Sequence, residues 1–398
     1  MKILMLTPYL PYPLWSGGQT RSFNLLKYLS KKHHITLFSF IRDEKEKENI
    51  RYLKEYCENV KVFSKRPPWS LTSLMLSGVT FYPLVVCMYL RSEVNKAISQ
   101  AVEKENFDLI HAETFYVMPN IPVFNIPIIL AEQTIEYLVY RHYTHSVGLW
   151  PVKMLMKWDV AKIKFWEKRF WRKSNRVVAM SEADRQMMHH NLPDLKVDLV
   201  PNGVDPEFFS QKKVKFKKNG RTVLFVGNFK WLQNREAVMI LVKKVWPKIK
   251  RTLKDAKLWI VGKYPTADIL KLRSFDITVS ENINDIRDAY DKSDILLAPI
   301  KGPGGTRYKI LEAMASGIPV VTTKVGIEGL NAKNEDTVLI CEEISELART
   351  TIRVLTDPSL YHKIAFNSRK FVEKNYNWET ISNSLDQIYN QAVYEKKV

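Results

Sequence analysis

The stretch that decides the fold is Ala298–Thr323, APIKGPGGTRYKILEAMASGIPVVTT. An apolar strand ends at Pro299, and a glycine-rich loop leads into helical patterning from about Thr306 to Ser316. A second apolar strand, Ile318–Thr322, follows at once. A strand, a short glycine-rich loop and a helix in this order are typical of a parallel α/β sheet with helices on both faces.

The same segment carries residues suited to an anionic ligand. Its glycines, Gly305 among them, let the backbone approach a ligand closely. The helix start near Thr306 offers free amide groups and the positive end of the helix dipole. Arg307 and Lys309 add two cations there, and the Glu312 carboxylate suits hydroxyl groups such as those of a ribose. This pattern predicts a nucleotide diphosphate site, and the alternative is an ordinary loop with solvated charges.

The alternation of strands and helices continues in both directions from this segment. The first half opens with a strand at Lys2–Thr7, a loop ending in Gly17-Gly18 and a helix from about Gln19 to Ser30. The sequence predicts further strands at His34–Phe40, Val60–Phe63, Asp108–His111, Pro127–Ala131, Arg176–Met180, Lys196–Val200, Thr222–Val226, Lys257–Val261, Ile277–Val279 and Ile295–Pro299, a helix at about Asn234–Lys250, and helical structure after Leu339 that ends in Trp378–Tyr394.

Pro201-Asn202-Gly203 is the expected boundary, because proline interrupts a strand ladder and Asn-Gly favours a turn. We therefore expect an N-terminal Rossmann-like domain over residues 1–203 and a C-terminal one over 204–372. A C-terminal helix, 373–398, is expected to pack back toward the first domain. The predicted fold class is α/β, with two doubly wound domains facing a central cleft.

Composition sets the compartment and excludes several classes of protein. Of 398 residues, 45% are hydrophobic and 26% charged, which indicates a globular chain with a large core. Cys57, Cys87 and Cys341 are scattered, so neither a disulfide framework nor a zinc cluster is expected, and the compartment is expected to be reducing.

The N-terminus lacks the pattern of a signal peptide, and the apolar run Leu71–Leu90 is broken by polar residues. We expect a cytoplasmic protein, with a buried helix, turn and helix at 71–90 rather than a membrane span.

Two other loops are expected along the same sheet edge. Gly227 with Lys230, and Gly262 with Lys263, each follow a predicted strand. Each loop adds a glycine and a cation to the predicted nucleotide site. The alternative for each is a tight turn beside a surface lysine.

The net charge of +19 concentrates in Trp150–Arg176, where nine basic residues accompany two acidic ones among several aromatics. Basic residues interleaved with aromatics favour contact with an anionic membrane surface, with Lys164, Lys168 and Arg172 as candidate contacts. The alternative is a helix whose aromatics lie in the core and whose basic face is simply solvated.

The segment Ala298–Thr323 resembles the donor-binding signature of retaining glycosyltransferases of family 4, among the glycosyl transferases of group 1. The resemblance continues in FVGNFKWLQNREAV, KLWIVGKYP, INDIRDAYDKSDILLAP and VPNGVDPEFF, and reaches Gly17-Gly18 and VVAMSEADRQ in the first half. It implies two Rossmann-like domains in the glycosyltransferase B fold and a nucleoside diphosphate-sugar as co-substrate. With its loop GGTRYK, the chain resembles a branch with a GGTR-x-K donor loop.

The resemblance also implies roles for residues of the donor site. Glu312 matches the glutamate that binds the ribose, whereas Gly304 stands where a second glutamate usually faces the sugar. The usual diphosphate-binding arginine and lysine are replaced by Asn228 and about Gln233. The diphosphate role is therefore expected at Arg307 and Lys309 with Lys230 as auxiliary. The residues expected to contact the donor are Gly17, Gly18, Gly227, Lys230, Gly262, Gly305, Thr306, Arg307, Lys309 and Glu312.

For the catalytic side chain, the resemblance points to the strand ending at His111. Family members often place a histidine at this point, and some relatives use the second following position, so His111 and Glu113 are both candidates. A satisfied buried histidine is the alternative for His111. Glu132 and Glu136 are expected at a helix start, where solvation is the simpler interpretation than contact with an acceptor.

The sequence therefore predicts a retaining glycosyltransferase of the hexosyl type that acts on a hydroxyl of a lipid-linked or polysaccharide acceptor. No Asp-x-Asp motif serves the diphosphate, so no metal or other cofactor is expected, and cations and backbone amides would stabilise the leaving group. The expected location is the cytoplasm, with peripheral contact at the inner face of the membrane. Alternatives are a nucleotide-sugar epimerase of the same architecture and a basic nucleic-acid-binding protein; the latter leaves the donor signature unexplained, so no nucleic-acid partner is expected.

Overall fold

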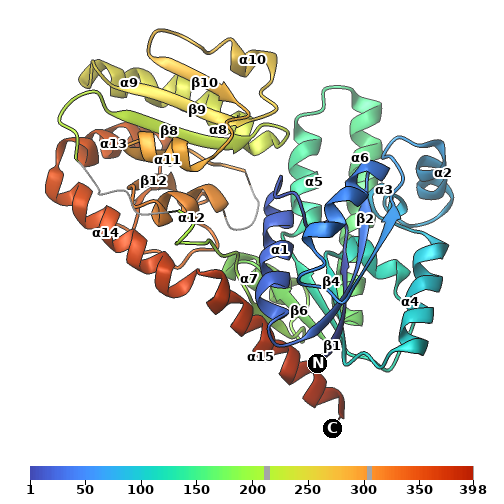
Figure 1. The fold of residues 1–398 in the computed structure, drawn as a ribbon. Helices are drawn as coiled ribbons and strands as arrows, with labels where there is room; N and C mark the ends of the chain where they lie inside the picture. The colour runs from blue at the N-terminus through green and yellow to red at the C-terminus, as the bar shows by residue number, and fades with distance from the viewer. Residues whose placement is uncertain (210–215, 303–306, 398) are drawn as a thin grey trace. The chain divides into compact units, whose positions relative to one another are not determined.

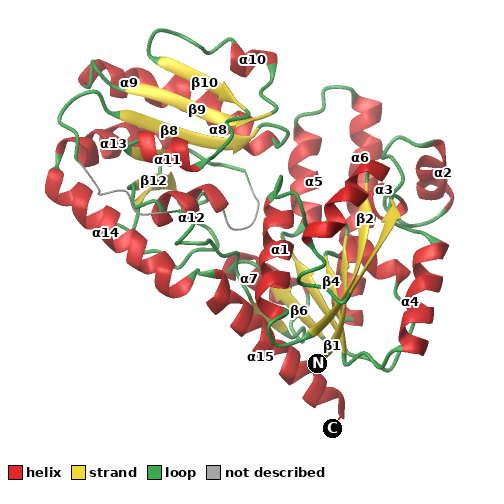
Figure 2. Ribbon diagram, in the orientation of Figure 1, coloured by secondary structure: helices red, strands yellow, loops and turns green. Residues whose placement is uncertain are grey.

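The computed structural model describes residues 1–209, 216–302 and 307–397. Contacts divide the chain into two compact units (Figure 1). Unit 1 comprises Met1–Pro201 and Ile381–Val398, and unit 2 comprises Asn202–Thr380. Each unit is built on one parallel sheet with helices packed against it (Figure 2).

The strands of unit 1 form one seven-stranded sheet in the order β3-β2-β1-β4-β5-β6-β7, and every pair is parallel. Their bounds are β1 (Lys2–Thr7), β2 (His34–Ile41), β3 (Asn59–Ser64), β4 (Leu109–Glu113), β5 (Ile128–Glu132), β6 (Arg176–Ala179) and β7 (Val197–Leu199). The chain order reverses between β1 and β4. At such a switch point the loops after the two strands diverge, which leaves room for a ligand at the carboxyl edge.

Unit 2 repeats this plan with six strands in the order β10-β9-β8-β11-β12-β13, again all parallel. Their bounds are β8 (Thr222–Asn228), β9 (Lys257–Lys263), β10 (Ile277–Glu281), β11 (Ile295–Ala298), β12 (Val320–Thr323) and β13 (Leu339–Cys341). The switch point of this sheet lies between β8 and β11. The two doubly wound sheets confirm the predicted fold class.

Fifteen α-helices are described, together with three short 3-10 segments and one π-helical turn. The α-helices are α1 (Gly17–Leu29), α2 (Leu71–Val79), α3 (Leu84–Cys87), α4 (Ser92–Lys104), α5 (Glu136–His145), α6 (Trp150–Lys173), α7 (Glu182–Asn191), α8 (Leu232–Ile240), α9 (Trp246–Thr252), α10 (Ala267–Leu270), α11 (Arg287–Lys292), α12 (Tyr308–Ala315), α13 (Leu347–Thr356), α14 (Pro358–Asn375) and α15 (Trp378–Lys397). The short elements are η1 (Glu44–Tyr52), η2 (Phe115–Asn120), η3 (Leu241–Val245) and η4 (Ile344–Glu346).

Both faces of each sheet are buried, which explains why the strands read as continuous apolar runs. In β8, Val223 belongs to one apolar cluster and the next residue, Leu224, to another on the opposite face. In β1, the consecutive residues Ile3 and Leu4 are both fully buried. Successive side chains of a strand point to opposite faces, so helices must cover both sides of these sheets.

Several element boundaries differ from the sequence-based expectations. Strands β4, β8 and β9 continue two residues beyond their predicted ends, because polar residues and glycines at the sheet edge keep the ladder paired. The helix predicted at 234–250 is interrupted by a π-helical turn just before Pro247, which has no N–H to continue the hydrogen-bond ladder. The prediction of helical structure after Leu339 is wrong at its start, where Leu339–Cys341 form β13. The helix predicted at 150–176 ends at Lys173, and Arg176 begins β6.

Residues 71–90 form the expected helix, turn and helix, α2 and α3. The expectation that both are buried is wrong for α2, where Ser73 is the one buried residue. Within the described ranges, no helix combines the length and the hydropathy that a membrane span requires.

Candidate functional site

In unit 2, the edge of the sheet at the switch point is shaped by two glycines. Gly227 and Gly262 are paired across β8 and β9, and a Cβ at Gly262 would collide with the carbonyl oxygen of Gly227. Both glycines therefore lie within strands rather than in the turns expected for them. Their requirement for glycine comes from the close approach of the two strand ends.

The helix α12 follows β11 and begins at this edge. Its first residue in the described part of the chain is Tyr308, with Arg307 as N-cap, one to two residues later than predicted. The Arg307 guanidinium donates a hydrogen bond to the Gly302 carbonyl at 2.7 Å. Gly305 and Thr306, both predicted to contact the donor, lie outside the described residues.

Lys309 points into unit 2 and is buried. Its ammonium donates a hydrogen bond to Asn234 Oδ1 at 2.7 Å and lies 4.5 Å from the centre of the Phe225 ring. Burial and the neighbouring Arg307 charge lower the pKa of Lys309 to about 7. The site therefore holds an amine whose protonation changes near neutral pH.

Glu312 lies one turn further along α12, on the same side as Lys309. The hydroxyl of Tyr290, a fully buried residue of α11, donates a hydrogen bond to Glu312 Oε2 at 2.7 Å. Burial raises the pKa of Glu312, although the Tyr290 hydrogen bond and the Lys309 charge oppose this. One oxygen of the carboxylate is thus held by the protein, which fixes the direction of the other.

The third predicted cation of this edge, Lys230, follows β8. Its ammonium lies 3.7 Å from the centre of the Tyr264 ring, close enough for a cation–π interaction. Tyr264 follows β9 directly and has a φ of 58°, in the left-handed region that non-glycine residues rarely adopt. The structure thus brings Lys230 to the ends of β8 and β9, as the switch-point rule predicts for these loops.

In unit 1, Gly17 and Gly18 form the first turn of α1 rather than a loop before it. Ser16 caps this helix, since its side chain accepts a hydrogen bond from the Gln19 amide. A Cβ at Gly18 would collide with the Tyr9 hydroxyl and with the Gln133 side chain. Close packing at the carboxyl edge of the sheet therefore requires a glycine here.

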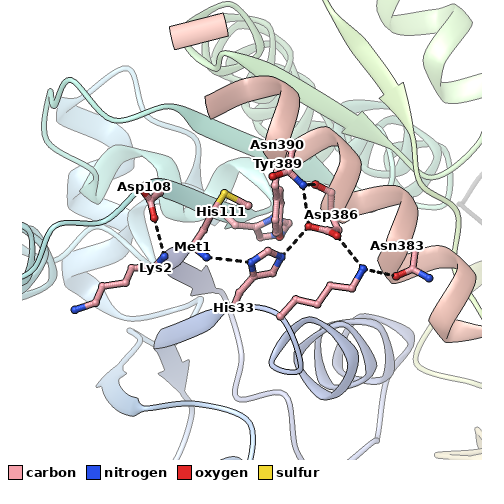
Figure 3. A network of polar contacts seen from close by, with 10 residues as sticks. Met1, Lys2, His33, Asp108, His111, Asn383, Asp386, Tyr389 and Asn390 are labelled. Carbon is pink, nitrogen blue, oxygen red and sulfur yellow. Dashed lines mark hydrogen bonds and ion pairs between the residues drawn. The ribbon is translucent and has the colours of Figure 1, made fainter. Parts of the chain in front are cut away.

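His111 lies inside β4 and is fully buried. Its Nδ1 is 2.8 Å from the hydroxyl of Tyr389, which belongs to α15, and its Nε2 is 3.2 Å from Glu113 Oε1. Figure 3 shows His111 below Tyr389. Both ring nitrogens have protein partners. This is the arrangement expected of a buried histidine whose hydrogen bonds are all made within the protein.

The same helix, α15, is held to unit 1 by further polar contacts, shown in Figure 3. Asp386 accepts from Lys32 at 3.0 Å and lies 2.9 Å from His33 Nε2. Lys32 also donates to Asn383 Oδ1 at 2.9 Å. The C-terminal residues 381–397 thus pack against the sheet of unit 1 and cover His111.

Glu113 is the last residue of β4 and is also fully buried. Gln133 Nε2 donates to Glu113 Oε2 at 2.9 Å and also contacts the Tyr9 hydroxyl, while Arg21 Nε lies 3.7 Å from Glu113 Oε1. Burial alone would raise the pKa of Glu113, but the His111 hydrogen bond and the Arg21 charge outweigh it, so the pKa is lowered. Glu113 is therefore a buried, ionised carboxylate at the switch point of unit 1.

The backbone turns sharply directly after Glu113. Thr114 has a φ of 68°, a rare conformation for a β-branched residue. Such strain persists only where the surrounding structure imposes it, and it is frequent at functional sites.

Glu132 and Glu136 are not the solvated carboxylates that the sequence suggested. Glu132 is fully buried beneath α6, where Trp171 Nε1 donates to its Oε1 at 3.1 Å. Burial and the nearby Glu167 charge raise the pKa of Glu132 well above its usual value. Burial raises the pKa of Glu136 to about 7. Glu167 accepts the amide of Glu136 and so caps the start of α5.

The three membrane-contact candidates lie along the second half of α6. Lys164 and Arg172 are exposed and Lys168 is half-buried. The Lys164 ammonium lies 5.2 Å from the centre of the Tyr137 ring. Burial and the charges of Lys164 and Arg172 lower the pKa of Lys168.

Sequence reasoning missed the partners that orient the candidate residues. Tyr290 and Asn234 hold Glu312 and Lys309 in unit 2, and Arg21, Gln133 and Tyr389 hold Glu113 and His111 in unit 1. No local pattern marks these five residues, since each reaches its partner from a distant element. One sequence signal could have pointed to them: some lie within segments that resemble the family, as Tyr290 does in INDIRDAYDKSD.

Comparison with known proteins assigns the chain to a family. The sequence model described as "Glycosyltransferase Family 4" matches residues 15–208, and the model described as "Glycosyl transferases group 1" matches residues 220–357. An uncharacterized 44.6 kDa protein in the cps region of Klebsiella pneumoniae is 22% identical, over 96% of this chain and 98% of its own.

Two further similarities agree with this assignment. An Escherichia coli UDP-Gal:alpha-D-GlcNAc-diphosphoundecaprenol alpha-1,3-galactosyltransferase is 21% identical over 75% of this chain and 79% of its own. The crystal structure of Anabaena Alr3699/HepE in complex with UDP and glucose superposes with a TM-score of 0.65 at 18% identity, covering 98% of this chain and 100% of that one. With two parallel α/β sheets and family matches on both units, the chain belongs to the group 1 glycosyltransferases of the B fold.

Proposed function

We propose that this glycosyltransferase moves a hexose-type sugar from a nucleoside diphosphate-sugar to a hydroxyl of a lipid-linked or polysaccharide acceptor, with retention of anomeric configuration. The observation that carries the donor assignment is the arrangement on α12, where Lys309 and Glu312 lie one turn apart, Lys309 held by Asn234 and Glu312 by the buried Tyr290. The complex of HepE with UDP and glucose and the lipid-linked acceptor in the name of the E. coli relative support the two substrate classes.

In the proposed donor site, Glu312 accepts hydrogen bonds from the ribose hydroxyls. Tyr290 holds one carboxylate oxygen, so the carboxylate is oriented before the nucleotide arrives. Orientation in advance lowers the entropy cost of binding and adds selectivity for a vicinal diol. Lys230 and the strand ends at Gly227 and Gly262 lie at the same sheet edge and would contact the remainder of the nucleotide.

The diphosphate is the leaving group, and its negative charge grows as the bond to the sugar C1 breaks. Lys309, Arg307 and the amides at the start of α12 are the groups proposed to stabilise this charge. We propose that these cations suffice, so that transfer needs neither a metal nor another cofactor. Lys309 must then leave Asn234 or share its protons between Asn234 and a phosphate oxygen.

On the acceptor side, we propose Glu113 as the catalytic residue of unit 1 and His111 as a residue that positions it. In the reaction, the acceptor oxygen forms a bond to C1 on the face from which the diphosphate leaves. The acceptor proton passes to the departing phosphate oxygen, and the Glu113 carboxylate stabilises the positive charge that develops on the sugar. Its lowered pKa, maintained by His111 and Arg21, keeps it ionised for this purpose.

For the location, we propose the cytoplasm, with the protein held at the inner face of the membrane by the cations of α6. Lys164, Lys168 and Arg172 are the contacts proposed for anionic headgroups. A lipid-linked acceptor would then be within reach of the enzyme.

A thermal-shift panel of nucleotides and nucleotide-sugars tests the proposed donor class. A ligand at about 100 times its dissociation constant adds roughly 2.7 kcal/mol of stability, which is a readily measured rise in melting temperature. Titration calorimetry with the best ligand should then show that Glu312→Ala weakens binding by about 1.5 to 3 kcal/mol, the range for hydrogen bonds to a charged group.

Glu342→Ala, at an exposed glutamate of the same unit, is the matched control and should bind normally. Unchanged affinity in a folded Glu312→Ala protein would remove Glu312 from the site. Conversion of the donor without any acceptor would favour an epimerase instead.

A further inference from the structure

Exposed apolar side chains gather on two segments of unit 1. Of the 24 large apolar residues that are exposed in the described part of the chain, 13 lie within residues 69–81 and 149–165. Leu71 in α2 and Leu155 in α6 are 74% and 71% exposed. The 13 residues are Trp69, Leu71, Leu74, Met75, Val79, Phe81, Leu149, Trp150, Val152, Met154, Leu155, Trp158 and Phe165. We call this surface the α2–α6 ridge.

The two segments form one surface because α2 is fixed to α6. The Lys162 ammonium of α6 donates to the Ser77 carbonyl near the end of α2, at 2.9 Å, and to the Tyr82 carbonyl at 3.1 Å. A cation at this point satisfies helix carbonyls that lack intrahelical partners. Phe81 packs edge-on against Trp158 and Phe165, with ring centres 6.0 and 5.1 Å apart. The ridge is therefore part of the folded unit.

A row of cations runs beside these apolar residues on α6. Helical periodicity places Lys153, Lys157, Lys164, Lys168 and Arg172 on one face, next to the face that carries Met154, Trp158 and Phe165. Further along, Phe165, Lys168, Arg169, Arg172 and Lys173 line a surface pocket of about 430 Å³.

The acidic residues of α6 do not neutralise this row. Asp159 accepts the amide of Leu84 at 2.9 Å, and Glu167 accepts the amides of Glu136 and Tyr137. Asp159 also pairs with Lys162, 3.3 Å away, which lies outside this row. Burial, together with the neighbouring charges of Lys164 and Arg172, lowers the pKa of Lys168.

We propose that the α2–α6 ridge inserts into the headgroup region of an anionic phospholipid bilayer, with the adjoining cations of α6 on the lipid phosphates. The inference deepens the location given under the proposed function, because it assigns insertion to α2 and to the first half of α6. A second copy of this chain would bring +19 against +19. A nucleic acid would pair with the cations but leave the apolar ridge in water. Cations beside apolar and aromatic residues match the boundary between lipid headgroups and acyl chains.

Fluorescence of a labelled residue tests insertion directly. All three native cysteines are buried, so a cysteine introduced at an exposed position can be labelled selectively with an environment-sensitive dye. Labelled Leu71→Cys and Leu155→Cys should each show brighter, blue-shifted emission with vesicles of phosphatidylcholine and phosphatidylglycerol. Labelled Val123→Cys, at an exposed valine of unit 1 outside the ridge, should not change. Equal responses at all three positions, or no response at Leu71→Cys, would overturn the proposal.

Vesicle co-sedimentation separates the contributions of charge and of apolar contact. Lys164→Gln/Lys168→Gln/Arg172→Gln should weaken binding to anionic vesicles roughly a hundredfold, since each charge contributes about fivefold. Leu71→Ser/Met75→Ser/Leu155→Ser should weaken it by at least about tenfold. Matched controls are Lys243→Gln/Lys244→Gln/Lys248→Gln and Phe275→Ser, all at exposed positions of unit 2, and both should bind as the parent does.

A nucleotide thermal-shift assay on the same preparations distinguishes this proposal from the proposed function. Vesicle binding without a response to any nucleotide-sugar would support the ridge and contradict the donor assignment. A nucleotide response with no vesicle binding, or with binding that ridge variants do not weaken, would do the reverse. Self-association that is lost in the ridge variants, without vesicle binding, would assign the ridge to a second copy.

Discussion

The buried amine of Lys309 makes nucleotide-sugar binding depend on pH in a way that can be calculated. The pKa of Lys309 is about 7 in the free protein, against 10.5 for an ordinary lysine. A diphosphate beside the ammonium favours the charged form and should return the pKa toward its ordinary value. Binding should therefore take up about 0.5 proton at pH 7 and about 0.9 proton at pH 8.

The sign follows from linkage. Because the complex holds more protons than its separate components, affinity must fall as pH rises through the pKa of the free protein. Between pH 6 and pH 8 the dissociation constant should rise about tenfold, equivalent to about 1.4 kcal/mol. The two phosphates of a nucleotide-sugar are diesters and do not titrate in this range, so the change reports on the protein.

Titration calorimetry measures this uptake directly. At pH 8 the observed binding enthalpy should differ between phosphate and Tris buffers, in proportion to their ionisation enthalpies. Lys309→Arg keeps a positive charge that does not titrate, so binding should lose its buffer dependence. Identical enthalpies in both buffers for the parent protein would refute the reasoning. Proton release would instead point to the raised pKa of Glu312.

Three other variants test the remaining parts of the site. Tyr290→Phe removes the hydrogen bond to Glu312 and should weaken nucleotide binding by about 1.5 kcal/mol in calorimetry; unchanged affinity would show that Glu312 needs no orientation. Arg307→Ala should lower the turnover number more than about tenfold, while the parent enzyme keeps its transfer rate in EDTA. Activity that EDTA abolishes and magnesium or manganese restores would contradict the metal-free proposal. Glu113→Gln should lower kcat with little change in the KM for the donor, whereas Glu132→Gln, at the other buried strand-end glutamate, should retain kcat in a steady-state assay. Equal loss in both would assign Glu113 a structural role.

The fold was largely predictable because buried strands appear in the sequence as continuous runs of apolar residues. β1 has the predicted bounds, since its four consecutive apolar residues are flanked by Lys2 and Thr7. The strand ends at the carboxyl edge were underestimated. There, glycine and charged residues continue the ladder for reasons of pairing, as Gly227 and Gly262 show, and neither residue type signals a strand.

The candidate site was predictable only as a set of single residues. Lys309, Arg307 and Glu312 follow from the glycine-rich loop and the helix start. Their partners do not, because Tyr290 is 22 residues from Glu312 and Asn234 is 75 residues from Lys309. In unit 1 the separation is larger still, since Tyr389 is 278 residues from His111. Such contacts depend on how the helices pack, and a local pattern carries no information on that.

Burial was the other property that the sequence left open. His111 and Glu113 stand two residues apart in a strand. The local sequence is equally compatible with a buried pair and with an exposed acid and base. The structure decides between these by enclosing both among Tyr389, Gln133 and Arg21. For α6, the sequence left open whether its aromatics lie in the core or on the surface, and Trp158 and Phe165 are exposed.

The most direct test of a retaining sugar transferase is the anomeric configuration of its product. The full-length protein should be incubated with the nucleotide-sugar that stabilises it most, with and without an acceptor bearing a free hydroxyl, and the anomeric proton followed by NMR. The account predicts a new glycosidic signal with the anomeric configuration of the donor, formed only when the acceptor is present. A product of inverted configuration, or a donor sugar altered in the absence of acceptor, would contradict it.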